Sequence, residues 1–179
     1  IVQGLGNVGY YAAYFLSIED GAIITHVIER DGSIIDKNGI DIPLLKNHIN
    51  EKGTVKGFKG FVEIGPESLE QETDILIPAA MELVIDEANA ERIKAKLIVE
   101  AANGPVSAGA DEILNRKGIV IIPDLYANAG GVTVSYFEWI KNLSRIRLGR
   151  LQKRAQENQV STLIEGIENM TGKIFPADF

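Results

Sequence analysis

Short apolar runs alternate along the chain with segments whose apolar and polar residues follow a helical spacing. The apolar runs are residues 22–28, 74–78, 96–101 and 119–123. Runs that are apolar on both faces are typical of parallel strands covered by helices on both sides. Helical patterns lie between the later runs, at 88–94 and 110–117. The alternation predicts an α/β fold with a doubly wound, mostly parallel sheet.

Weaker signals fill the stretch between the second and third predicted strands. Asp41 is a candidate N-cap for a short helix over residues 42–51, and Gly53 would end that helix. Residues 55–64 mix glycine, phenylalanine and valine, and they fit either a short strand or an irregular loop. Two turn signals precede the helix, at 30–33 and 36–39.

The last part of the chain has a different character. From residue 144 to about 170 the pattern is that of an amphipathic helix, whose apolar face includes Val160, Leu163, Ile164 and Ile167. We therefore predict a main domain over 1–143 and a truncated helical extension over 144–179. So long a helix is expected to pack on residues outside this sequence or on another subunit. The chain has no initiator Met and opens inside its first predicted strand, so we interpret it as a piece of a longer protein.

A glycine-rich turn follows the first strand and precedes a helical pattern. Its spacing is G-x-G-x-x-G, with Gly4, Gly6 and Gly9. In a dinucleotide-binding turn the first glycine makes the tight turn, the second lets a pyrophosphate approach, and the third lets helix and strand pack closely. The N–H groups at the helix start would hold the phosphates. Glu29 ends the second strand 20 positions after Gly9, where a ribose-binding acid is expected. An ordinary glycine turn is the alternative, but the strand–turn–helix context favours a Rossmann-like domain.

Small or turn-forming residues follow the later strands. Ala79 and Ala80 follow one strand, Asn103 and Gly104 the next, and Asp124 the last. In open α/β sheets, ligands bind at the carboxyl ends of the strands. Small residues there leave room for a flat cofactor, and the Asn103 amide could bond a ribose or a carboxamide. Asn-Gly-Pro is also a good turn, so both roles stay open for Asn103.

Composition excludes several classes of function. The net charge is −7, which disfavours nucleic acid and anionic lipid as partners. No apolar run approaches the roughly 20 residues of a membrane span. The chain has no cysteine, which suits a cytoplasmic protein and leaves no thiol nucleophile or thiolate metal site.

Individual residues exclude further chemistries. His26 and His48 have no neighbours at metal-ligand spacing, so we expect both to be structural and expect no metal site. Ser107 and Ser135 lack a nucleophile-elbow motif, which argues against a serine hydrolase. The glycine turn lacks the Lys-Ser/Thr of a P-loop, which argues against a nucleoside triphosphatase.

Two features lie near the start of the helical extension. The aromatic residues Tyr136, Phe137 and Trp139 predict core packing rather than a stacking platform. A run of basic residues contains no acid: Lys141, Arg145, Arg147, Arg150, Lys153 and Arg154. A solvated helix face explains such a run, and a surface for an anionic effector or acidic partner is the alternative.

Taken together, these stretches resemble the glutamate dehydrogenase family of amino-acid dehydrogenases. The longest and most specific match is the run from Pro123 to Trp139, which contains Asn128-Ala129-Gly130-Gly131-Val132-Thr133-Val134-Ser135. The other matching pieces are Gly4 to Gly9, Glu29 with 31–33, 74–80, and Ala101 with 103–105. The resemblance covers essentially the whole chain, more loosely at 42–72 and after 155. The basic run resembles the start of an arm that helps subunits of larger, regulated members communicate.

The resemblance implies oxidative deamination of L-glutamate to 2-oxoglutarate and ammonia by hydride transfer to a nicotinamide cofactor, and the reverse. It implies that the pyrophosphate is held by Gly4, Gly6, Asn7, Val8 and Gly9. It further places Glu29 at the adenosine ribose, Ala80 near the cofactor, and Asn103 and Asn128 at the nicotinamide. Val132 and Ser135 would lie on the substrate side, with the Ser135 hydroxyl toward the distal carboxylate. The sequence Thr133-Val134-Ser135 resembles that of the glutamate-specific enzymes rather than that of their leucine, valine or phenylalanine relatives.

The family's catalytic lysines and its proton-shuttling aspartate belong to a separate substrate domain, and no motif resembling them occurs here. We therefore expect this chain to bind cofactor without turnover. Glu29 favours NAD because its carboxylate would repel a 2′-phosphate, whereas Arg30 beside it could offset that repulsion and admit NADP. The resemblance also implies a homo-oligomer, a hexamer in the family, for the full-length enzyme. A non-catalytic dinucleotide sensor and an assembly role for the basic helix are the competing hypotheses.

Overall fold

The computed structural model describes residues 1–143 and, after them, residues 162, 164, 166, 168, 170 and 172. The chain divides into two compact units, Ile1–Gly130 and Gly131–Phe179. The predicted boundary after residue 143 stays a prediction, and so does most of the predicted extension, because residues 144–161 lie outside the described part.

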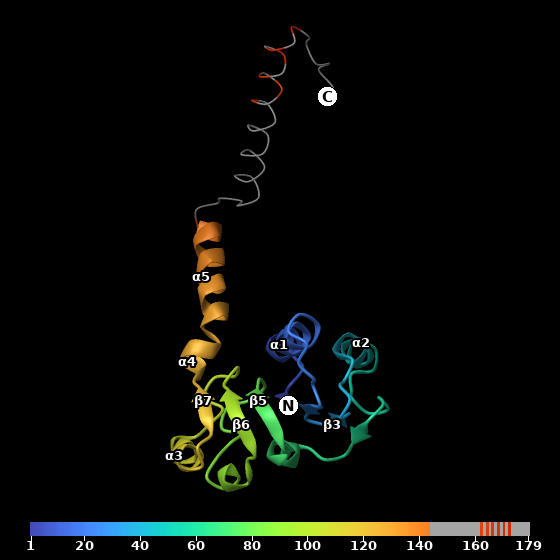
Figure 1. The fold of residues 1–179 in the computed structure, drawn as a ribbon, viewed down its shortest axis with the longest axis vertical. Helices are drawn as coiled ribbons and strands as arrows, with labels where there is room; N and C mark the ends of the chain where they lie inside the picture. Colours follow the sequence, from blue (N-terminus) through green and yellow to red (C-terminus); the bar gives the residue numbers. More distant parts are fainter. Residues whose placement is uncertain are drawn as a thin grey trace. The chain divides into compact units, whose positions relative to one another are not determined.

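A seven-stranded mixed sheet forms the centre of the first unit, in the order β4-β3-β2-β1-β5-β6-β7 (Figure 1). Five strands, β2-β1-β5-β6-β7, run parallel, while β3 and β4 pair antiparallel at one edge. This arrangement confirms the predicted α/β fold with a mostly parallel sheet. The strands are β1 Val2–Gln3, β2 His26–Glu29, β3 Gly32–Ile35, β4 Phe61–Val62, β5 Thr73–Pro78, β6 Ala95–Val99 and β7 Val120–Ile122.

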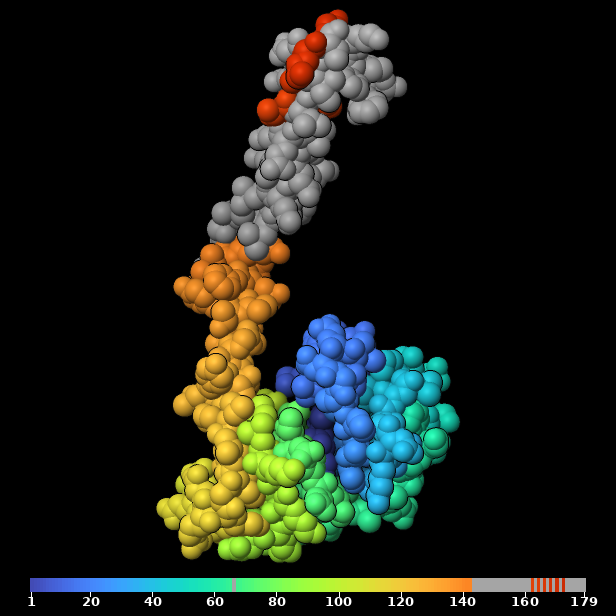
Figure 2. Space-filling view, in the orientation of Figure 1, coloured from blue at the N-terminus to red at the C-terminus, as the bar shows by residue number. Residues whose placement is uncertain are grey.

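Helices lie on both faces of the sheet. Helices α1 and α2 cover one face, and α3 lies on the other with the turns that connect the later strands (Figure 1). In the space-filling view the start of the chain, in dark blue, is visible only in a recess between α1 and the green β5 segment (Figure 2). The helices are α1 Asn7–Ile18, α2 Ile42–Lys52, α3 Ala108–Arg116, α4 Asp124–Ala127 and α5 Ala129–Leu143, with 3-10 turns η1 Pro66–Glu70 and η2 Ala90–Arg92.

The ends of α2 agree with the prediction. Asp41 is the N-cap, and its carboxylate accepts a hydrogen bond from Leu44 N at 2.8 Å. Gly53 is the C-cap, in the left-handed conformation at φ 68° that glycine adopts without strain. Leu45 is fully buried on the inner face. These signals are local, which is why the sequence identified them.

Three other segments differ from the sequence analysis. Strand β3, which the sequence did not predict, overlaps the first turn signal at 30–33 and pairs with β2 as an antiparallel hairpin. Strand β2 begins only at His26, so 22–25 are not strand, and the segment predicted as a helix at 88–94 contains only the single turn η2. Residues 55–64 contain the short strand β4, Phe61–Val62, and are otherwise irregular, so the segment combines both structures that the sequence allowed.

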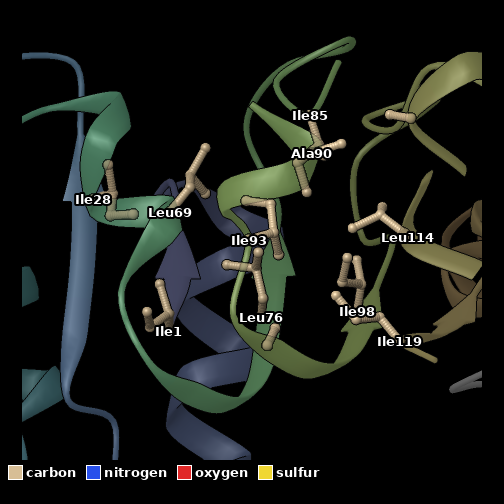
Figure 3. Close-up of a cluster of buried hydrophobic side chains, with 12 residues drawn as sticks. Ile1, Ile28, Leu69, Leu76, Ile85, Ala90, Ile93, Ile98, Leu114 and Ile119 are labelled. Atoms are coloured by element: carbon tan, nitrogen blue, oxygen red, sulfur yellow. The ribbon is translucent and has the colours of Figure 1, made fainter. Parts of the chain in front are cut away.

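Two apolar clusters hold the sheet to its covering segments. Figure 3 shows the cluster on the α3 side, where Leu76 of β5, Ile98 of β6 and Leu114 of α3 are fully buried together. The second cluster joins Val2 and Val27 to residues from α1 and α2. Each such aliphatic side chain contributes about 1.5–3 kcal/mol on burial, so the clusters fix the strand ends that form the site.

Helix α5 does not bury its aromatic residues in the described structure. Tyr136, Phe137 and Trp139 are 55%, 59% and 57% exposed, so the core packing predicted for them is not observed among the described residues. The helical spacing indicated an apolar face but could not indicate what covers it. Tyr136 and Trp139 stack on each other, with ring centroids 6.0 Å apart.

Only fragments of the predicted extension can be compared with the structure. Residues 162, 164, 166, 168 and 170 are helical, as the amphipathic pattern predicts. The predicted apolar positions Val160, Leu163 and Ile167 lie outside the described residues. So do all the basic residues of the run after Lys141.

Candidate functional site

The glycine turn lies between the end of β1 and the start of α1, as predicted. Gly4 has φ +85°, and a Cβ there would lie 2.7 Å from the Ala80 Cβ. A Cβ on Gly9 would lie only 1.8 Å from the Gly4 carbonyl oxygen. Both glycines are therefore required by the protein itself, because the turn, the helix and the end of β5 are in direct contact.

Gly6 differs from the other two glycines. Its φ of −67° and ψ of −163° are extended backbone, and a Cβ there would meet no heavy atom within 4 Å. Neither backbone strain nor packing against the described residues requires a glycine at this position. Gly6 is exposed, so a side chain at this position would obstruct only a molecule that approaches the turn from solvent.

The start of α1 can hold an anion. Gly6, Asn7 and Val8 are exposed there, no side chain caps the helix, and its first turn contains no acid. The first N–H groups of a helix have no intrahelical acceptor, and the helix dipole makes this end positive. A phosphate group fits the site, and Gly6 leaves it room to approach.

Two charged side chains hold Leu5, the residue between the first two glycines. Glu29 Oε1 accepts a hydrogen bond from Leu5 N at 2.5 Å. Lys46 of α2 donates from Nζ to Leu5 O at 2.7 Å, and its ammonium lies 5.5 Å from the centre of the Tyr10 ring. Lys46 was not found from the sequence, because it lies 41 positions from Leu5 and no motif marks it.

A cleft of about 520 Å³ opens at the carboxyl ends of β1, β2 and β5. Arg30 at its rim is exposed and forms no ion pair within the described residues. Gln3 Oε1, which also borders the cleft, is buried and has no hydrogen-bond donor among the described groups. The cleft is lined by Gln3, Gly4, Ile28, Glu29, Arg30, Leu69, Ala80, Met81 and Val84. It therefore joins the glycine turn to Glu29, as a nucleoside site requires.

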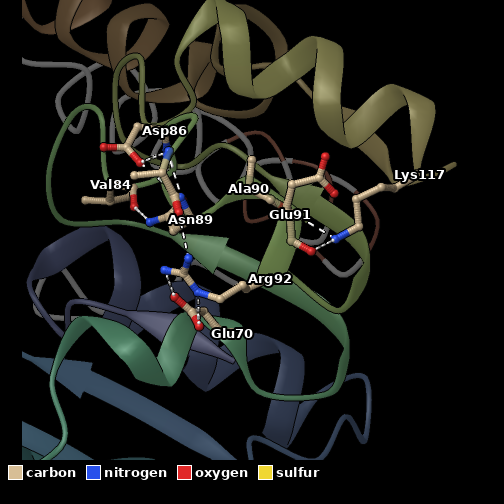
Figure 4. Close-up of polar contacts among 9 residues, drawn as sticks. Glu70, Val84, Asp86, Asn89, Ala90, Glu91, Arg92 and Lys117 are labelled. Carbon is tan, nitrogen blue, oxygen red and sulfur yellow. Dashed lines mark hydrogen bonds and ion pairs between the residues drawn. The ribbon is translucent and has the colours of Figure 1, made fainter.

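An ion pair joins two segments that lie beside this cleft. Arg92 of η2 donates to both carboxylate oxygens of Glu70, each at 2.8 Å (Figure 4). The Arg92 guanidinium lowers the pKa of that carboxyl through these hydrogen bonds. Because Leu69 and Val84 line the cleft, this pair connects the two segments that shape it.

The loops after β6 and β7 are connected by side-chain hydrogen bonds. Asn128 donates from Nδ2 to Asn103 Oδ1 at 2.7 Å and, more weakly, to Ala102 O at 3.4 Å. Asp124 Oδ2 accepts from Gly104 N at 2.9 Å. The structure thus brings together the predicted pair Asn103 and Asn128, one from each loop.

Glu100, which the sequence analysis did not single out, binds the start of the loop after β7. It is only 7% exposed, and its Oε2 accepts from Asp124 N at 2.9 Å. Burial raises the pKa of the Glu100 carboxyl, and the negative charges of Asp124 and Asp111 raise it further. A buried acid beside a loop is visible only once the strand ends are placed in space.

The remaining predicted residues have simpler positions. Ala79 N donates to Gln3 O at 2.8 Å, and Ala80 contacts the Gly4 turn. Val132 and Ser135 are exposed on α5, in the second unit, so their place on the substrate side stays a prediction.

The histidines have local contacts. His26 is buried with Nδ1 2.9 Å from Thr25 Oγ1, and His48 Nε2 lies 3.0 Å from Lys56 O. In the described part of the chain, no three His, Cys, Asp or Glu side chains converge as metal ligands. No helix there has both the length and the apolar character needed to cross a membrane.

The profile of the family described as Glutamate/Leucine/Phenylalanine/Valine dehydrogenase matches residues 1–171. The chain belongs to this family. The glycine turn, Glu29 and the Asn103–Asn128 pair all lie within the matched range.

Individual members of the dehydrogenase family are similar over nearly all of the chain. A probable glutamate dehydrogenase of Sinorhizobium fredii is 52% identical over 180 residues, which are 99% of this chain and 41% of that protein. The mitochondrial glutamate dehydrogenase of Dictyostelium discoideum is 47% identical over 97% of this chain and 35% of its own length. This family member therefore spans well under half the length of these relatives.

A solved structure shares the fold. The hetero-hexameric glutamate dehydrogenase of Thermus thermophilus, in its Leu-bound form, superposes with a TM-score of 0.74 at 25% identity. The match covers 97% of this chain and 42% of that one.

Proposed function

We propose that this chain is the coenzyme-binding domain of an NAD(P)-dependent glutamate dehydrogenase, which interconverts L-glutamate with 2-oxoglutarate and ammonia. The observation that carries the proposal is Gly6, which has no structural need to be glycine yet opens the positive start of α1. A ligand phosphate explains both facts together.

Different residues of the site would bind different parts of the cofactor. The backbone at Gly6, Asn7 and Val8 would hold the pyrophosphate, and Gly4 and Gly9 would keep the turn closed around it. One carboxylate oxygen of Glu29 accepts a hydrogen bond from Leu5 N. No described protein group donates a hydrogen bond to its second oxygen. That oxygen would accept a hydrogen bond from the adenosine ribose.

The opposite end of the site would hold the nicotinamide. Asn103 and Asn128 orient each other, so their remaining amide groups are fixed for a ribose or carboxamide. When bound, the nicotinamide accepts or gives the hydride of the reaction. Val132 and Ser135 would face the glutamate side chain, and Glu100 would hold the loops at a constant separation.

The acid–base groups would come from a substrate domain outside this chain, so we expect cofactor binding here without turnover. NAD is the first choice because of Glu29, and NADP is the second because of Arg30. The full-length enzyme would be an oligomer, as the hexameric Thermus protein is. A cytoplasmic location, which the absence of cysteine favours, belongs to the same proposal.

Calorimetric titration of the chain with NADH, compared between two glycine variants, tests this proposal. Gly6→Ala should keep the wild-type stability and weaken NADH binding by about tenfold or more, because the methyl group would project toward the phosphates. Gly53→Ala should show the reverse, with a stability loss of roughly 1 kcal/mol at its left-handed C-cap and unchanged binding. Wild-type protein that does not bind NADH, or Gly6→Ala that binds it normally, would refute the assignment.

A further inference from the structure

Lys46 is a charged group that the proposed function has not yet used. It lies half-buried on α2, and its ammonium forms no ion pair with any described carboxylate. Its contacts are neutral, namely the Leu5 carbonyl at 2.7 Å and the face of Tyr10. The Lys96 ammonium, by contrast, pairs with Asp74 at 2.6 Å. In a protein of net charge −7, an unneutralised ammonium beside the glycine turn needs an explanation.

The position of Lys46 relative to Glu29 follows from the residue that they share. Glu29 bonds the N–H of Leu5 and Lys46 bonds its C=O. The N and O atoms of one residue are only about 3–4 Å apart, so the two charged groups lie within about 9 Å of each other. Leu5 is buried, at 2% exposed, which fixes this arrangement on the turn.

We propose that Lys46 determines specificity by binding the phosphate on the adenosine ribose 2′ oxygen, so that the site accepts NADP(H) as well as NAD(H). The proposal rests on the proposed function, because it assumes that the ribose lies at Glu29. A ribose oxygen bonded to Glu29 would be about 2.7 Å from the carboxylate. A phosphorus atom on that oxygen extends roughly 1.6 Å further, which brings its oxygens within reach of the Lys46 side chain.

Charge supports the same assignment. A 2′-phosphate carries about −1.5 to −2 charges, and Glu29 alone would repel it. Arg30 at the rim of the cleft and Lys46 at the Leu5 carbonyl supply two positive charges near Glu29. A flexible ammonium can leave a carbonyl for a phosphate, which is the stronger acceptor because it is charged. Lys46 would therefore brace the turn when NAD binds and pair with the phosphate when NADP binds.

Calorimetry with two small probes separates this role from simple bracing. Adenosine 2′,5′-bisphosphate and adenosine 5′-monophosphate differ only in the 2′-phosphate. Lys46→Met should weaken binding of the bisphosphate about tenfold more than it weakens binding of the monophosphate, because only the bisphosphate loses a charge partner in addition to the brace on the turn. Lys46→Arg should retain most of the bisphosphate affinity. Lys52→Met, on the exposed end of the same helix, is the control for a general loss of positive charge.

Each alternative outcome has a distinct meaning. If Lys46→Met weakens both probes equally, or changes neither, Lys46 only stabilises the turn and the inference is overturned. Equal effects of Lys46→Met and Lys52→Met on the bisphosphate would overturn it as well, because charge alone would explain them. Wild-type chain that binds neither probe nor NADH would instead refute the proposed function itself.

Discussion

Adding one methyl group at Gly9 should destabilise the whole first unit, since the obstacle that it meets is backbone. The new Cβ would lie 1.8 Å from the Gly4 carbonyl oxygen and 2.9 Å from the Gly4 carbonyl carbon. Real Cβ atoms essentially never approach within 3.0 Å, so α1 would have to move away from the turn by more than about 1 Å.

The structure gives this displacement little room. Gly4 N is bonded to Ile28 O at 2.7 Å, and α1 buries Ala13 completely in the second apolar cluster. Moving either side therefore breaks a sheet hydrogen bond or opens the core. Overpacking of this kind costs about 3 kcal/mol, a large part of the roughly 5–15 kcal/mol that stabilises a typical domain.

Urea denaturation followed by circular dichroism measures this loss, with Gly6→Ala as the matched control. Gly6→Ala should stay within about 0.5 kcal/mol of wild type, since its methyl group meets nothing. The double variant Gly9→Ala with Ala79→Gly should not recover, because Ala79 Cβ at 3.3 Å is the lesser obstacle. Wild-type stability in Gly9→Ala, or full recovery in the double variant, would show that the turn is not held as described.

Two further predictions concern carboxylates. Glu29→Ala should weaken NADH binding by about tenfold and narrow the gap to NADPH, since both a ribose acceptor and a negative charge are lost; an unchanged preference would contradict its role. Burial raises the pKa of Glu100, so the folded state favours its protonated form. Stability from this group is therefore greatest below its ordinary pKa of 4.5 and is lost as pH rises through the raised pKa. Urea denaturation from pH 4 to 8 should show wild type losing stability relative to Glu100→Gln as pH rises, and a constant difference would argue against a raised pKa.

Local signals in the sequence were sufficient for part of this fold. The glycine turn, the apolar strands and the Asp41 and Gly53 caps each depend on residues within a few positions of one another. Their physical causes are steric or involve one short hydrogen bond, so a single sequence contains them. The Glu29 prediction also used a fixed spacing, and the structure places that side chain on the turn.

The features that the sequence did not reveal depend on distant pairing. Strand β3 contains only Gly-Ser-Ile-Ile, and it is a strand because β2 and β4 lie on either side of it. Lys46 and Glu100 act on residues 41 and 24 positions away. The aromatic face of α5 shows a related limit, because an apolar periodicity identifies a surface to be covered without naming its partner.

The contact between Gly4, Gly9 and Ala80 also has a consequence for kinetics. A turn that has no space for a Cβ at Gly4 or at Gly9 is already in its final shape before any ligand arrives. The entropy of ordering the phosphate site is then lost during folding rather than during binding. Association should need no slow rearrangement of this turn, so differences in affinity between related dinucleotides should arise mainly from their rates of dissociation.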